Sequence, residues 1–270
     1  TDEFIFDPMW VLRRAQWKSI LPKAPITFPL ALWRAWRRIR QHSVVYLSTA
    51  VIWDHIIAAR FAGRPAVFHV HEIPGGFATK IIGHIVRFSR ASIVFNSKAT
   101  QASYALVRGQ SGTVVYNGIA GPASAEPSDY DGSRKLRLLL PGRFNRIKGQ
   151  DVLVEAITLL SPEQRARLEV RLIGGVFEND TATRDRVVEL IEQHGLHDCV
   201  KMEDFQKDIS GAYAATDVVV VPSQRPEPLG RVAIEGMAYA KPVIVSNIGG
   251  LPETVENGVS GWYVEAGDAV

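Results

Sequence analysis

Short apolar runs alternate with helix-length segments along the whole chain. In the first half, the runs that predict strands are Val44–Ser48, Ala66–Val70, Ser92–Phe95 and Thr113–Tyr116. In the second half they are Leu136–Leu140, Leu168–Ile173, Val200–Met202, Val218–Val221, Val243–Val245 and Gly261–Val264. Strands that alternate with helices form parallel sheets through right-handed crossovers. The pattern therefore predicts an α/β protein.

One segment interrupts this rhythm and predicts a division into two domains. Residues 121–134 are rich in Gly, Pro, Ser and Asp and lack apolar periodicity, as is typical of a linker. The 270 residues are enough for two domains that each bury a core. We expect an N-terminal domain over 1–120, a linker over 121–134 and a C-terminal domain over 135–270.

Charge separates the two halves further. Residues 1–130 carry 15 Lys and Arg against 7 Asp and Glu, whereas residues 131–270 carry 16 against 21. The basic first half suits an anionic acceptor or membrane, and the acidic second half argues against a nucleic-acid surface. Cys199 is the single cysteine, so an intrachain disulfide is excluded and a reducing, cytoplasmic location is favoured.

Residues 10–41 combine tryptophan with basic residues. They hold Trp10, Trp17, Trp33 and Trp36 among Arg13, Arg14, Lys18, Lys23, Arg34, Arg37, Arg38 and Arg40. A basic helix with interfacial tryptophans can lie on an anionic membrane, here the cytoplasmic face of the inner membrane. The alternative is a helix that covers a domain, with tryptophans packed inward and arginines solvated. Nucleic-acid binding is disfavoured, because no recognised module accompanies the patch.

Two glutamates stand eight residues apart around a predicted helix start. Glu227 precedes Gly230, and Glu235 lies in the apolar helical pattern that follows. Free backbone N–H groups at a helix start suit a diphosphate, and carboxylates accept hydrogen bonds from hydroxyls. Phosphate beside polyol hydroxyls describes a nucleotide sugar. The alternative is a strand, loop and helix with solvated glutamates.

A basic loop follows the first strand of the second half. Gly142 permits a tight turn at the carboxyl end of this strand, where open α/β sheets bind ligands. Arg143 and Lys148 would there act as fixed cations that stabilise a leaving diphosphate without a metal. The alternative is an ordinary solvated loop.

These two stretches, Leu140–Gly149 and Arg225–Glu253, resemble the Gly-Arg…Lys-Gly and Glu-x7-Glu motifs of retaining glycosyltransferases of family 4, the glycosyl transferases group 1. The resemblance covers about residues 30–270 and is strongest over 136–264. It implies the GT-B fold, in which two Rossmann-like parallel-sheet domains face a cleft, with 1–120 as the acceptor-side domain and 135–270 as the domain that binds the nucleotide-sugar donor. The first domain is expected to be incomplete. Thr1–Asp7 lacks the family's initial strand and glycine-rich loop, and the family's last helices do not follow Val264, so truncation at both ends is expected.

The same resemblance implies roles for individual residues. Glu227 would contact hydroxyls of the donor sugar, Glu235 would contact the ribose, and Arg143 and Lys148 would hold the diphosphate. Close backbone would line the donor at Gly142, Gly174, Gly175, Leu229, Gly230 and Arg231. Residues 203–206 would lie beside the base.

A histidine pair ends the second predicted strand. His69 and His71 share a strand face and precede Glu72, which invites a metal site, but no convincing third ligand follows. A histidine facing the cleft can instead hydrogen-bond the donor sugar or relay a proton, and His71 matches the family better. A purely structural histidine is the remaining alternative. We therefore expect no metal.

Together these features predict a retaining glycosyltransferase. It would move a hexose or N-acetylhexosamine from a UDP- or GDP-sugar to a hydroxyl of a glycan or lipid-linked acceptor, with no cofactor. The family's usual proposal is front-face displacement, and no paired carboxylates stand out for double displacement. Bacterial polysaccharide or lipopolysaccharide synthesis would suit the basic segment. Two alternatives are a sugar-nucleotide epimerase of the same fold and a catalytically weak nucleotide-sugar-binding module.

Overall fold

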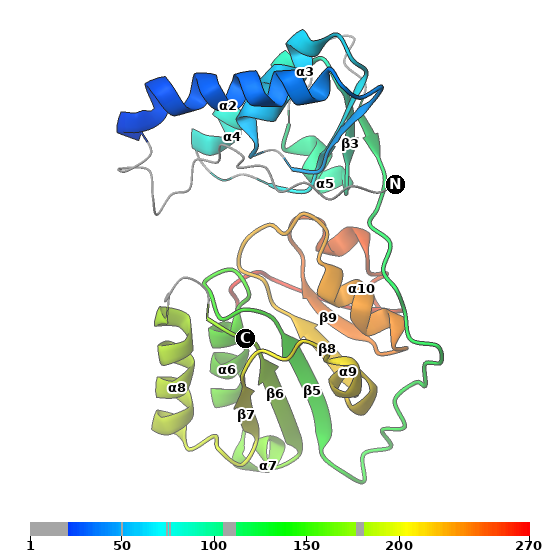
Figure 1. The fold of residues 1–270 in the computed structure, drawn as a ribbon. Helices are drawn as coiled ribbons and strands as arrows, with labels where there is room; N and C mark the ends of the chain where they lie inside the picture. The colour runs from blue at the N-terminus through cyan, green and yellow to red at the C-terminus, as the bar shows by residue number, and fades with distance from the viewer. Residues whose placement is uncertain (1–20, 50, 74, 76, 105–111, 177–180) are drawn as a thin grey trace. The chain divides into compact units, whose positions relative to one another are not determined.

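The computed structural model describes residues 21–49, 51–73, 75, 77–104, 112–176 and 181–270. The chain divides into two compact units, Thr1–Tyr116 and Asn117–Val270, each built around its own parallel sheet (Figure 1). Each strand that the apolar runs predict is present, within one or two residues at its ends. The α/β class is confirmed. Parallel strands that are covered on both faces appear in sequence as apolar runs, as in β8 (Val218–Val221).

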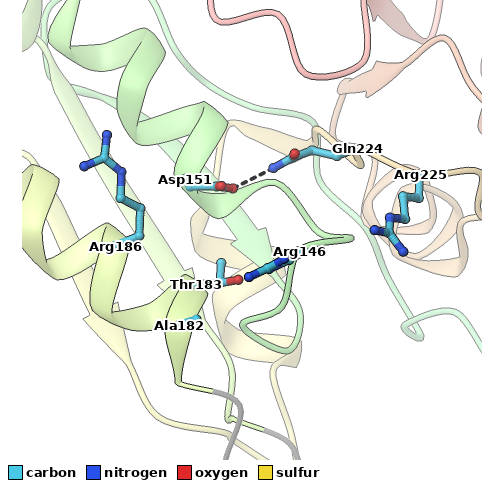
Figure 2. Close-up of a pocket in the computed structure, with 7 residues that line it drawn as sticks. All are labelled: Arg146, Asp151, Ala182, Thr183, Arg186, Gln224 and Arg225. Carbon is cyan, nitrogen blue, oxygen red and sulfur yellow. Dashed lines mark hydrogen bonds between the residues drawn. The ribbon is translucent and has the colours of Figure 1, made fainter. Parts of the chain in front are cut away.

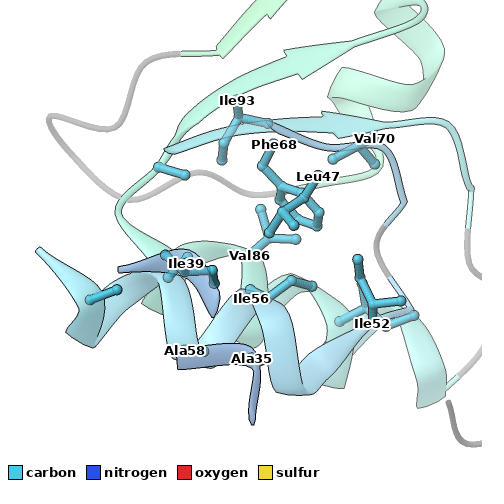
Figure 3. Close-up of a cluster of buried hydrophobic side chains, with 14 of the residues drawn as sticks. Ala35, Ile39, Leu47, Ile52, Ile56, Ala58, Phe68, Val70, Val86 and Ile93 are labelled. Atoms are coloured by element: carbon cyan, nitrogen blue, oxygen red, sulfur yellow. The ribbon is translucent and has the colours of Figure 1, made fainter. Parts of the chain in front are cut away.

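Unit 1 contains a four-stranded sheet in the order β1-β2-β3-β4. Its strands are β1 (Val45–Leu47), β2 (Ala66–Val70), β3 (Ser92–Phe95) and β4 (Gly112–Val114). Its helices are η2 (Leu21–Lys23), α2 (Ala24–Ile39), α3 (Trp53–Ala62), α4 (Phe77–Ser89) and α5 (Lys98–Ala102). Phe68, Val70 and Ile93 of the sheet belong to one buried cluster with Ile56 of α3 and Val86 of α4 (Figure 3).

Unit 2 contains a six-stranded parallel sheet in the order β10-β9-β8-β5-β6-β7. The strands are β5 (Leu136–Pro141), β6 (Leu168–Ile173), β7 (Val200–Glu203), β8 (Val218–Val221), β9 (Val243–Ser246) and β10 (Gly261–Val264). The helices are α6 (Gln150–Thr158), α7 (Pro162–Arg165), α8 (Ala182–His194), α9 (Ser210–Ala215), α10 (Arg231–Ala238) and η3 (Leu251–Glu253). The chain moves outward from β5 through β6 and β7, then returns to β8 on the other side of β5. The strand order thus reverses between β5 and β8, which is where open α/β sheets bind ligands.

The segment before β5 is attached to unit 2. Residues 117–135 form no helix or strand, yet their side chains and backbone reach the sheet. Ser128 Oγ and Arg134 Nη1 each donate to the Asp217 carboxylate at 2.6 Å, and Lys241 Nζ donates to Glu126 O at 2.9 Å. Arg137 of β5 adds bonds to the same carboxylate from its backbone N, at 2.8 Å, and its guanidinium. The composition that predicts a linker gave no indication of this attachment.

Candidate functional site

The predicted donor residues of the second half gather at one edge of the unit 2 sheet. Four loops meet at the carboxyl ends of the central strands, on both sides of the β5/β8 reversal. They are residues 142–149 after β5, 174–175 after β6, 222–230 after β8 and 247–250 after β9. Gly142, Arg143, Lys148, Gly174, Gly175, Glu227, Leu229 and Gly230 all lie in them. Arg231 and Glu235 follow in α10.

The loop after β5 is held by a residue that the sequence analysis missed. Gln150 begins α6 and is fully buried, and its Nε2 donates to Gly142 O at 3.1 Å and to Arg143 O at 3.0 Å. The aromatic ring of Phe144 is buried beneath the loop, and its backbone N donates to Gly175 O at 3.0 Å. The exposed Arg143 side chain therefore stands on a fixed backbone. The sequence shows Gln150 only as a polar residue in the first turn of a predicted helix, which does not reveal its burial.

Glycine is required where these loops approach one another. A Cβ atom on Gly149 would lie 1.9 Å from Pro222 O, and one on Gly174 would lie 1.9 Å from Gly142 O. Both distances are far below van der Waals contact with backbone atoms. The loops after β5, β6 and β8 therefore pack backbone against backbone, which brings their cations and carboxylates to one place.

Lys148 and Glu227, 79 residues apart, form an ion pair within this edge. Lys148 Nζ lies 2.8 Å from Glu227 Oε1, and Ser223 Oγ donates to the same oxygen. The Glu227 side chain is only 10% exposed. A carboxylate with so little contact with water is stabilised by the ammonium and hydroxyl. Glu227 is therefore not a solvated surface residue, and Ser223 joins the site as a partner that the sequence did not reveal.

The start of α10 supplies backbone N–H groups and a second carboxylate. Gly230 precedes the helix with a φ of 78°, and the buried Leu229 side chain fixes the preceding turn. Tyr213 OH donates to Glu235 Oε2 at 2.9 Å, and Arg231 Nη2 lies 3.3 Å from Oε1. Burial and the adjacent Glu235 carboxylate raise the pKa of Tyr213 well above its ordinary value. Tyr213 therefore stays protonated and holds Glu235 as a hydrogen-bond donor.

The region predicted to adjoin the base has a fixed carboxylate and an exposed ring. Arg171 Nε and Nη2 donate to the two carboxylate oxygens of Glu203, at 2.6 and 2.9 Å. These hydrogen bonds lower the pKa of Glu203, so its side chain is ionised and engaged within the protein. Phe205 follows β7 and is 72% exposed. Its Cβ lies 3.3 Å from the position that a Cβ on Gly175 would take, so Phe205 lies beside the glycine turn.

His71 lies in unit 1, at the carboxyl end of β2. Its Nε2 is 3.4 Å from Ser48 Oγ, and its ring centroid is 3.9 Å from that of His69. His69 Nδ1 lies 2.5 Å from Tyr46 OH, and the Glu72 carboxylate accepts from the Thr49 hydroxyl. Burial, with a smaller contribution from His71, lowers the pKa of His69. Across the described residues, no three His, Cys, Asp or Glu side chains cluster as metal ligands would.

The basic aromatic segment is described from residue 21 onward, so Trp10, Trp17, Arg13, Arg14 and Lys18 lie outside the described residues. The two remaining tryptophans differ in their exposure to solvent. Trp36 packs against the unit 1 core and its Nε1 donates to Phe61 O at 3.4 Å, whereas Trp33 is 51% exposed. The α2 helix thus covers the unit with one face and presents a tryptophan on another. None of the described helices is both long and apolar enough to cross a membrane.

Comparison with protein families and curated sequences assigns the second half of the chain to a known family. The model for glycosyl transferases group 1 matches residues 131–270, just over half of the chain. The D-inositol 3-phosphate glycosyltransferase of Streptomyces avermitilis is 28% identical over 289 residues, covering 93% of this chain and 61% of the relative. The protein of that name from Thermobispora bispora is 36% identical over 136 residues, covering 48% of this chain and 32% of the relative. The chain spans less than two thirds of the length of these relatives.

Solved structures agree on the fold. Anabaena Alr3699/HepE in complex with UDP and glucose superposes with a TM-score of 0.76 at 25% identity, covering 93% of this chain and 70% of that chain. Sucrose-phosphate synthase from Thermosynechococcus elongatus superposes with a TM-score of 0.70 at 21% identity, covering 93% of this chain and 67% of that chain. The chain has the GT-B glycosyltransferase fold and belongs to the glycosyl transferases group 1 family.

Proposed function

We propose that this chain provides the donor site of a retaining, metal-independent hexosyltransferase that uses a UDP-sugar. The observation that carries the proposal is the Lys148–Glu227 ion pair at the strand-order reversal, with Glu235 as the fifth residue of the following helix. The UDP and glucose bound to the Anabaena neighbour support uracil as the base and glucose as the sugar.

In this proposal each part of the donor meets a different part of the edge. The diphosphate lies between Arg143, Lys148 and the backbone N–H groups at the start of α10. The Glu227 carboxylate accepts from sugar hydroxyls and Glu235 accepts from the ribose. The exposed Phe205 ring offers a stacking surface for the base, because aromatic faces stack readily on nucleobases.

The reaction breaks the bond between the anomeric carbon and the diphosphate oxygen. The acceptor hydroxyl forms the new bond on the same face of the sugar, and its proton passes to an oxygen of the leaving diphosphate. Negative charge grows on that diphosphate, and Arg143 and Lys148 are fixed cations placed to stabilise it.

For the acceptor, we propose a hydroxyl of a glycan or lipid-linked molecule. The curated relatives are named for D-inositol 3-phosphate, which makes a phosphorylated polyol the second acceptor class to test.

Donor binding is tested first by thermal shift with UDP, UDP-glucose, GDP-mannose and ADP-glucose. We expect the uridine ligands to raise the melting temperature, since a ligand that binds only the folded state stabilises it by RT ln(1 + [L]/Kd). Glu235→Ala should abolish the rise, whereas Glu256→Ala, an exposed glutamate of the same unit, should retain it. An equal rise in both variants would contradict the assigned site.

Product analysis separates the alternatives. A transferase with UDP-glucose and acceptor releases UDP, an epimerase converts the donor without an acceptor, and a binding module shows the thermal shift but neither product.

We also propose that α2 docks this enzyme on an anionic membrane, where a lipid-linked acceptor is found. Ile26, Leu30 and Trp33 form an exposed apolar stripe at helical spacing, flanked by Lys23, Arg34 and Arg37. The sequence from Pro8 to Trp53 holds no Asp or Glu, so no acidic residue of this stretch offsets these charges. An interfacial helix combines these two properties.

Vesicle sedimentation tests this docking. Vesicles with about one third phosphatidylglycerol should bind the protein and pure phosphatidylcholine should not. Arg34→Gln/Arg37→Gln should weaken binding by tenfold or more, because each basic residue contributes about 1 kcal/mol at an anionic surface. Arg184→Gln/Lys207→Gln removes the same charge from exposed positions in unit 2 and should leave binding unchanged. Equal losses in both variants would contradict the proposal.

A further inference from the structure

A basic pocket lies in unit 2 beside the starts of α6 and α8. Its volume is about 350 Å³, and it is lined by Arg146, Asp151, Ala182, Thr183, Arg186, Gln224 and Arg225 (Figure 2). Lys148, Glu227 and Glu235 are not among these lining residues. The pocket is therefore separate from the donor residues, although it is built partly from the same loops.

Three guanidinium groups and one carboxylate line this pocket. The carboxylate and one of the guanidinium groups are bonded to other side chains of the protein. Asp151 Oδ1 accepts from Gln224 Nε2 at 2.8 Å. Arg186 is paired with Glu155 and Glu189, at 3.3 and 3.0 Å.

Arg146 and Arg225 provide the uncompensated charge. Both are exposed, and within the described part of the chain neither side chain makes an ion pair or hydrogen bond. These two arginines therefore line the pocket with no ion-pair partner among the described residues.

We propose that this pocket binds a phosphate monoester, with Arg146 and Arg225 as its main ligands. Planar guanidinium groups bind phosphate oxygens in pairs, and their charge suits a dianion. Figure 2 shows the Arg146 guanidinium beside Thr183, whose buried side chain adds a hydroxyl to the wall. The α6 and α8 helices begin at the pocket, so the positive ends of both helix dipoles favour an anion.

The size of the pocket limits the ligand. About 300 Å³ is the lower end for small-molecule pockets, so a phosphorylated sugar or polyol fits better than a nucleotide. The phosphate group itself could equally come from free inorganic phosphate, which shares the same chemistry.

Occupancy of this pocket would act on the donor site through two loops. Arg146 is two residues before Lys148, and Arg225 is two residues before Glu227. Gln224 N donates to Ile147 O at 2.8 Å, which already joins these loops. A phosphate bridging Arg146 and Arg225 would restrain both loops and strengthen UDP binding. This coupling rests on the proposed function, whereas phosphate binding in the pocket does not.

Calorimetric titration at constant ionic strength tests the site with inorganic phosphate, glucose 6-phosphate and glucose. We expect saturable binding of the phosphates and none of glucose. Arg146→Gln/Arg225→Gln should lose about tenfold in affinity for each arginine, since a hydrogen bond to a charged group contributes roughly 1.5 kcal/mol or more. Arg184→Gln/Lys207→Gln is the charge-matched control and should bind as the wild type does.

The outcomes distinguish the two sources of the phosphate group, and they distinguish binding in the pocket from binding at the donor site. Tighter binding of glucose 6-phosphate than of phosphate supports a phosphorylated polyol, and equal binding supports free phosphate. Lys148→Ala should lose UDP affinity and keep phosphate affinity. If Lys148→Ala abolishes phosphate binding, the phosphate occupies the donor site and the pocket proposal is overturned. Equal affinity in the double variant and its control, or no saturable binding, also overturns it.

Discussion

Lys148→Ala is expected to lower the rate of UDP release from UDP-glucose by about 100- to 1000-fold, the usual effect of removing one fixed group that stabilises transition-state charge. The ammonium of Lys148 is held 2.8 Å from Glu227, at the loop edge where the diphosphate is proposed to lie. Its loss would remove positive charge from the leaving group and leave the nearly buried Glu227 carboxylate with the Ser223 hydroxyl. A coupled assay for released UDP gives the rate.

Two further variants show whether the effect is local. Lys148→Arg keeps the charge and should retain more activity than alanine. Glu227→Gln keeps the shape of the carboxylate and should bind UDP normally while losing the extra affinity for UDP-glucose. A melting temperature measured without ligand shows whether each variant is folded. Wild-type rates in folded Lys148→Ala would refute the role given to this lysine.

Asp217→Asn is expected to destabilise unit 2 by about 2–4 kcal/mol, as for the loss of one partner from a buried network of charged hydrogen bonds. The Asp217 side chain is 1% exposed and accepts from Ser128, Arg134 and Arg137. An asparagine amide would present N–H groups to guanidinium groups that need acceptors. Urea denaturation followed by circular dichroism measures the change in unfolding free energy.

The pH dependence of the stability lost in Asp217→Asn provides a second test. Burial alone would raise the pKa of Asp217, but the hydrogen bonds from Arg134, Arg137 and Ser128 outweigh it and hold the pKa far below the ordinary value. A depressed folded-state pKa gives stability that is complete above the unfolded pKa of about 3.9 and is lost as pH falls toward the folded pKa. The difference in unfolding free energy between wild type and Asp217→Asn should thus be constant from pH 6 to 8 and should shrink below pH 4.

Asp129→Asn is the matched control for this prediction. Asp129 also contacts Arg134, at 2.5 Å, but its side chain is 84% exposed. Because water screens an exposed pair, its replacement should change stability little. A similar loss in both variants would show that the number of charges, and not the burial of Asp217, determines the effect.

The sequence predicted the fold well because each predictive signal was local. Val218–Val221 is a continuous apolar run, as is typical of a covered parallel strand, and it folds as β8. The gathering of the motif residues at one edge followed, since strands in a parallel sheet end at the same edge and the loops after β5, β6 and β8 carry these residues. The ion pair between Lys148 and Glu227 was not predicted, because it joins positions 79 residues apart.

What the sequence did not predict depends on contacts between distant positions. Tyr213 holds Glu235 from 22 residues away, and Ser128 reaches Asp217 across 89 residues. Gln150 cannot be distinguished in the sequence from an ordinary exposed polar residue, because its contact with the loop after β5 is seen only in the structure. Likewise, nothing local separates Trp36, which packs into unit 1, from Trp33, which is exposed.

The attachment of Ser128 and Arg134 to Asp217 determines which part of the chain can be exchanged as an independent piece. A chimera cut at residue 135, where regular structure begins, would separate the Asp217 carboxylate from two of its partners. The family match itself begins at residue 131, after Ser128. Lys241 also uses the backbone of Glu126. An exchangeable segment that contains unit 2 therefore has to begin upstream of Glu126, and the junction of a chimera belongs before that residue.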